Sequence, residues 1–127
     1  MRKDAEEFLK AAEDDLLASE ELFRNGRYRI VAFHAQQAAE KYLKAYLLEK
    51  TESYPFTHSI SDLIELCSHV DGDFEHLFDI RAHTLEEYYT HSRYPPVLEI
   101  SEDEAREAIR VARAVGEFVR KKLSMRC

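Results

Sequence analysis

Cysteine is scarce in this chain, and long apolar runs are missing. The two cysteines, Cys67 and Cys127, lie outside any C-x-x-C spacing, which excludes a disulfide framework and a structural zinc site. No apolar run exceeds four residues, so the sequence predicts no membrane span. The opening "MRKDAEEFLK" shows no apolar leader, and we therefore expect a cytoplasmic protein with no membrane partner.

The chain also has fewer basic than acidic residues. The chain has 18 Lys and Arg against 25 Asp and Glu, a formal net charge of -7. This balance disfavours the general attraction to phosphates on which non-specific nucleic-acid binding depends, so a nucleotide or RNA site would need a local basic patch. A length of 127 residues predicts a single domain, residues 1–127, with one core.

With only three glycines and three prolines, the few breaks in the pattern are easy to place. Between them, apolar residues recur three and four positions apart, the period of amphipathic helices and not of strands. The predicted helices are Asp4–Arg24, Tyr28–Lys50, the short Ile60–Val70, a fourth from Asp73 toward Pro95, and a last one from Ser101 to Leu123.

Several helix ends have recognisable signals. Asn25-Gly26 can close the first helix in a left-handed conformation, and Asp73 can cap the fourth. Ser101 and Glu104 have the S-x-x-E spacing of a capping box. The chain is therefore predicted to be all-α, an up-and-down four-helix bundle with an additional short helix.

The second helix is expected to be central, because its small alanines allow close approach by a neighbour. Its polar edge is predicted to make hydrogen bonds between helices; it consists of His34, Gln36, Gln37 and Lys41. One buried stripe cannot absorb all the aromatic residues nearby, which favours a homodimer; these are Tyr28, Phe33, Tyr46 and Phe56.

Three stretches have a distinctive amino-acid sequence: "HAQQAAEKYLKAYL" from His34, the following "THSISDLIEL", and "LEEYYTHSRYPP" before the last helix. Together they resemble the HEPN family of small helical proteins, and the resemblance extends from about Asp4 to Leu123. It implies a dimeric bundle often encoded beside a minimal nucleotidyltransferase. It also implies a nucleotide- or RNA-binding role and no cofactor.

Many members of that family are metal-independent RNA endonucleases of toxin-antitoxin pairs, with an R-x4-6-H motif near the end of the fourth helix. Arg81 matches the arginine by position, but residues 86–88 are Glu, Glu and Tyr. The resemblance therefore implies a binding module without catalysis of its own. A ribonuclease toxin is the alternative, and the catalytic residues are left unassigned.

The predicted binding surface for a nucleotide, an RNA or a partner protein follows from the same segment. Its candidate residues are Arg81, Tyr88, Tyr89, His91, Arg93 and Tyr94. A guanidinium beside aromatic rings can bind a phosphate while a ring stacks on a base. The alternative for this segment is simpler: Pro95 ends the helix and Tyr94 packs beneath the loop.

Arg81 interrupts the apolar stripe of the fourth helix, which leaves two interpretations. It forms a buried ion pair, for which Glu40 is a candidate partner, or it faces a ligand or a dimer surface. Spacings of four residues also align His83, Glu87 and His91 on that helix. We interpret that line as a solvated face and predict no metal site.

Overall fold

The structure is a computed structural model that describes residues 1–91, residue 95 and residues 99–124, without the side chains of residues 90 and 91. All regular elements within these ranges are helical, which confirms the all-α class. They are α1 (Lys3–Arg24), α2 (Tyr28–Thr51), α3 (Ile60–Val70), η1 (Gly72–Glu75), α4 (His76–Asp79), η2 (Ala82–Glu86), α5 (Glu87–His91) and α6 (Glu102–Ser124), where η marks a 3₁₀ helix.

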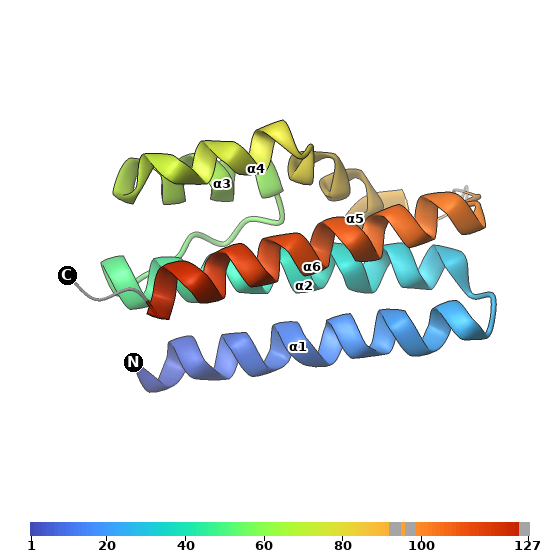
Figure 1. Cartoon of the computed structure of the whole chain (residues 1–127), viewed down its shortest axis with the longest axis horizontal. Helices are drawn as coiled ribbons and strands as arrows, with labels where there is room; N and C mark the ends of the chain where they lie inside the picture. Colours follow the sequence, from blue (N-terminus) through green and yellow to red (C-terminus); the bar gives the residue numbers. More distant parts are fainter. Residues whose placement is uncertain (92–94, 96–98, 125–127) are drawn as a thin grey trace.

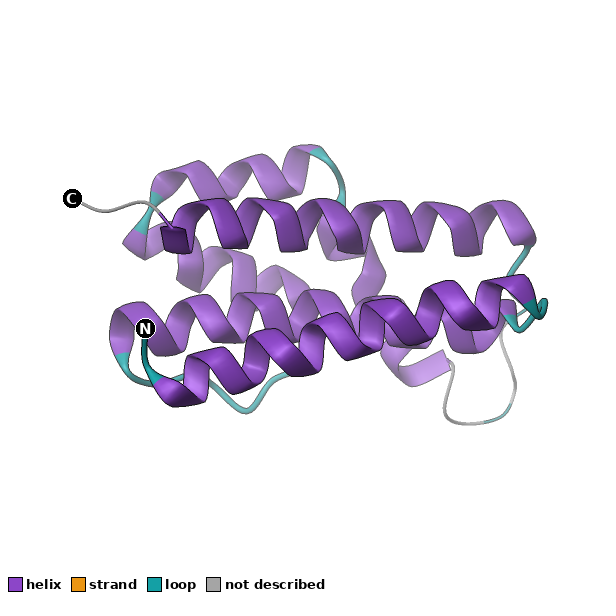
Figure 2. Cartoon of the chain, turned by 60° about the horizontal axis from the view of Figure 1, so that its bottom comes forward, coloured by secondary structure: helices purple, strands orange, loops and turns teal. Residues whose placement is uncertain are grey.

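The helices form an up-and-down arrangement (Figure 1). α1 and α2 run in opposite directions, the segment from η1 to α5 runs back along the upper side, and α6 returns beside α2. The hydrogen bond from Tyr28 to Glu102 joins the starts of α2 and α6, so these two helices run in parallel. The loop after α2 leads to α3, the additional short helix, which lies above the three long helices in Figure 1. Figure 2 draws the described chain as helices and loops.

α2 is the central helix, as predicted. Fourteen of its residues are buried, and it packs against α1, α3 and α6. Its alanines at positions 32, 35, 38, 39 and 45 have no exposed surface. Tyr46 is also buried and packs on Phe74, with ring centroids 4.4 Å apart, so its inclusion among the residues that the core could not absorb was wrong. Phe56 is 99% exposed, as that prediction required.

The predicted helix ends are mostly confirmed. Gly26 has a φ of 73°, the left-handed conformation that glycine adopts without strain. The capping box is complete: the Ser101 N–H donates to Glu104 at 3.1 Å, and the Glu104 N–H donates to the Ser101 hydroxyl at 3.1 Å. The prediction for Asp73 was wrong. The cap is Asp71, whose carboxylate accepts from the Asp73 N–H at 3.0 Å.

The fourth helix is not continuous. Arg81 has a φ of 64°, which ends α4 and begins the tighter η2. At this break Ala82 takes the buried position that was predicted for residue 81, and Arg81 is exposed. Phe74, Leu77 and Leu85 keep their predicted places in the core.

Gly116 allows the close approach of α6 to α2. A Cβ atom at this position would lie 2.6 Å from the Cζ atom of Tyr42, whose ring is buried. We expect Gly116→Ala to lower the free energy of unfolding by about 1–3 kcal/mol through overpacking. Helix propensity favours alanine by roughly 1 kcal/mol and offsets part of this loss, so the net destabilisation is expected to reach up to about 2 kcal/mol.

Chemical denaturation measures this effect, and Gly72→Ala is the matched control. A Cβ atom at Gly72 would meet nothing within 4 Å, so its stability is expected to change by less than about 0.5 kcal/mol. Equal stability of the two variants would contradict the proposed close packing.

Candidate functional site

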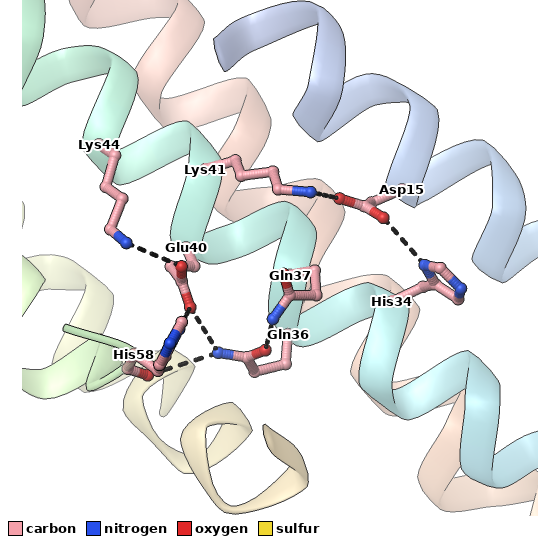
Figure 3. Close-up of polar contacts among 8 residues, drawn as sticks. All are labelled: Asp15, His34, Gln36, Gln37, Glu40, Lys41, Lys44 and His58. Carbon is pink, nitrogen blue, oxygen red and sulfur yellow. Dashed lines mark hydrogen bonds and ion pairs between the residues drawn. The ribbon is translucent and has the colours of Figure 1, made fainter. Parts of the chain in front are cut away.

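A buried carboxylate lies at the centre of a polar network on α2 (Figure 3). The Glu40 side chain is 5% exposed, and its Oε2 atom accepts from the Lys44 ammonium at 2.9 Å. Its Oε1 atom accepts from the Gln36 amide at 3.1 Å and lies 3.0 Å from Nδ1 of His58. Since a carboxylate only accepts, Nδ1 of His58 carries a hydrogen and donates it.

The polar edge of α2 makes two further sets of contacts. Gln37 donates to the side-chain oxygen of Gln36 at 2.8 Å. Asp15 of α1 pairs with both His34 and Lys41, and the His34 contact measures 2.9 Å (Figure 3). His34 and Lys41 therefore bond between helices, as predicted. Gln36 reaches the backbone of the loop before α3, at His58, whereas the hydrogen bond of Gln37 stays within α2.

His58 connects this network to α5. Its ring stacks on Tyr89, with centroids 3.9 Å apart and planes inclined by 15°. Nearby, Glu86 accepts hydrogen bonds from the hydroxyl and the N–H of Ser61 at the start of α3. These two ties fix α5 and η2 against α2 and α3. Sequence reasoning did not select His58 as a site residue, although it lies within the resembling stretch "THSISDLIEL".

Arg81 and Tyr88 meet at a cavity of about 290 Å³ between the η2–α5 segment and α6. Its floor is mainly apolar, and its outer wall on α6 is acidic. The lining residues are Ile80, Arg81, Thr84, Leu85, Tyr88, Asp103, Glu104, Glu107, Ala108 and Val111. Burial raises the pKa of Tyr88, and Glu87, Glu104 and Glu107 raise this pKa further. Two of these carboxylates, Glu104 and Glu107, line the cavity together with Tyr88.

The structure corrects one interpretation of Arg81 and leaves part of the predicted surface untested. Arg81 is exposed, and Glu40 is bonded to other groups, so the predicted buried ion pair between them was wrong. The Arg93 and Tyr94 positions lie outside the described residues, as does the side chain of His91. The side chains of Tyr88 and Tyr89 are described. Tyr88 lines the cavity, whereas Tyr89 stacks on His58.

The predicted line of His83, Glu87 and His91 does not exist as one helix face. His83 lies in η2, whereas the other two lie in α5. The interpretation of His83 as solvated was also wrong, because its Nδ1 atom is buried and its ring packs against Phe78 at 5.3 Å. In the described part of the chain, no group of three His, Cys, Asp or Glu residues could hold a metal ion.

Comparison with known protein families identifies the family of this chain. The HEPN domain family matches residues 5–122, almost the whole chain. The chain belongs to the HEPN family. This confirms the resemblance and its extent. No helix in the described ranges of this HEPN chain has the length and apolarity needed to cross a membrane.

Two solved structures are similar to this HEPN chain over nearly their full lengths. TT1696 from Thermus thermophilus is 27% identical, with a TM-score of 0.75 over 95% of this chain and 99% of that one. ST0689, described as an archaeal HEPN homologue, is 28% identical, with a TM-score of 0.68 over 98% and 100%. A comparison with curated proteins finds no match.

Proposed function

We propose that this HEPN chain is a partner-binding module without catalysis of its own, and that its partner is a separate minimal nucleotidyltransferase. The cavity at Arg81 and Tyr88 carries the proposal. It combines an apolar floor with an exposed guanidinium, features that are common at protein interfaces. Its η2–α5 wall is held by the stacking of Tyr89 on His58 and by the hydrogen bond from Ser61 to Glu86, so little ordering remains to be done on binding.

The composition of the η2–α5 segment supports a role without catalysis. Cleavage of RNA through its 2'-hydroxyl needs a proton-transfer group and a cation near the phosphate. The residues that follow Arg81 at the motif spacing are Glu86, Glu87 and Tyr88, and Glu86 is already engaged by Ser61. A carboxylate there would repel the phosphate. The ribonuclease toxin therefore stays the alternative.

A nucleotide or an RNA end is a second candidate ligand, favoured by the stacked pair of His58 and Tyr89. Aromatic side chains of this kind bind bases by stacking, which contributes about 1–3 kcal/mol per base. The His58 side chain is 49% exposed, so part of the pair is accessible. Titration with ATP and with a short single-stranded RNA, in parallel with the partner protein, separates the two candidates.

We expect the purified chain to form a complex with the nucleotidyltransferase of its own cell, and we expect Arg81→Ala/Tyr88→Ala to weaken that complex at least about tenfold. Sedimentation velocity measures the affinity and the stoichiometry, and it also tests the predicted homodimer. Arg24→Ala is the control, because it removes an arginine at the end of α1, away from the cavity.

The same preparation tests the alternative. Incubation with single-stranded and transfer RNA in EDTA is expected to leave the RNA intact. Cleavage that is abolished by Arg81→Ala would overturn the proposal in favour of a ribonuclease. Absence of both a complex and nucleotide binding would refute the binding module itself.

A further inference from the structure

The cavity between α5 and α6 has a lining of unbalanced charge. Asp103, Glu104 and Glu107 contribute three carboxylates, and among the described residues that line the cavity Arg81 is the one basic residue. Counted without Arg106 and Arg110, the exposed arginines that pair with Asp103 and Glu107, the lining residues carry two net negative charges, above a floor that includes Leu85 and Val111. Where a partner takes the place of those arginines, this combination favours a positively charged group over a phosphate.

The acidic groups are accessible to a partner. Asp103 pairs with Arg106 at 2.9 Å, and Glu107 pairs with Arg110, but all four side chains are more than half exposed. Exposed ion pairs of this kind contribute about 0–1 kcal/mol, so a cation from a partner can replace or share them.

From these observations we infer that the cavity binds a basic, partly aliphatic segment of the partner protein, with Lys or Arg on the α6 wall and an aliphatic side chain on the floor. The inference rests on the proposed role as a partner-binding module and adds the chemistry of the partner. Charge complementarity selects this occupant over an acidic segment or a nucleic acid, because either of these would bring like charges together.

Two labelled synthetic peptides test the inference directly: an amphipathic Lys/Leu peptide and its Glu/Leu counterpart. Fluorescence anisotropy is expected to show binding of the Lys/Leu peptide only. Asp103→Asn/Glu107→Gln is expected to weaken that binding about tenfold. The control Asp14→Asn/Glu21→Gln removes the same charge from exposed positions on α1 and is expected to bind as the wild type does.

A variant that leaves the charge unchanged tests the floor. Thr84 is exposed and lines the cavity, so Thr84→Phe should obstruct the cavity and weaken binding of the Lys/Leu peptide. Equal weakening by the α6 and α1 charge variants would overturn the inference, because it would reduce the effect to overall charge. Full binding by Thr84→Phe would overturn it as well. Circular dichroism confirms that each variant is folded.

The complex with the nucleotidyltransferase separates this inference from the proposed function. Competition by the Lys/Leu peptide for that complex is the expected result. A complex that forms but ignores both the peptide and the α6 variant would refute the inference and leave the proposed function intact. If the peptide binds at the cavity but no complex with the nucleotidyltransferase forms, the proposed function is refuted and the inference about the cavity stands.

Discussion

Glu40→Ala is expected to lower the free energy of unfolding by about 3–5 kcal/mol, because it leaves a buried ammonium without its counter-charge. Lys44 is only 7% exposed, and its ammonium also lies over the face of the Tyr54 ring, at 5.3 Å, which cannot replace a carboxylate. Gln36, which is fully buried, would lose its acceptor on Glu40 at the same time. Urea denaturation followed by circular dichroism measures the change.

The double variant Glu40→Leu/Lys44→Met is the control for this interpretation. It removes both charges and keeps similar volume, and such replacements of buried pairs are often neutral or stabilising. We therefore expect it to be clearly more stable than Glu40→Ala. Equal loss in the two variants would show that packing of the Glu40 stem, and not the unpaired charge, is responsible.

Phe74→Ala is expected to cost about 3–5 kcal/mol of stability, the usual range for removal of a buried phenylalanine ring. Phe74 has no exposed surface and lies between two other rings. Its centroid is 4.4 Å from that of Tyr46 and 5.0 Å from that of Phe118, which it meets edge to face. Loss of these contacts adds to the cost of the cavity.

The chain offers a matched control in Phe56→Ala. The same atoms are removed, but Phe56 is 99% exposed, so we expect a change within about 0.5 kcal/mol. A large loss of stability for Phe56→Ala at low protein concentration would contradict this exposure. If that loss instead grew with protein concentration, it would indicate that Phe56 is covered in the predicted homodimer.

Sequence reasoning identified most of the helices because helical period is a local property. α1, α2 and α3 begin and end within one residue of the predicted positions. The capping box of Ser101 and Glu104 could also be recognised in the sequence, because its two partners are only three residues apart. Even so, Val70 continues the predicted stripe of α3 and is 44% exposed. The helical period of the apolar residues shows which residues share a face of the helix. It does not show how far along the helix other elements cover that face.

The break at Arg81 had no such local signal. Arginine does not favour a positive φ, and the apolar spacing from Phe74 to Tyr88 reads as one helix. The tertiary contacts hold η2 and α5 in place: Glu86 reaches Ser61, and Tyr89 reaches His58. As a result of the break, Ala82 enters the core and Arg81 lines the cavity.

The sequence by itself determined the class of the fold, most of the helices, the central place of α2 and the family. These depend on helical spacings of about three to seven residues and on short motifs. Only the tertiary structure decided which groups form the site. Glu40 and His58 are 18 residues apart, and Arg81 lies far along the chain from the acidic wall of its cavity, which begins at Asp103. Contacts over such separations depend on how whole helices pack, and no local pattern encodes them.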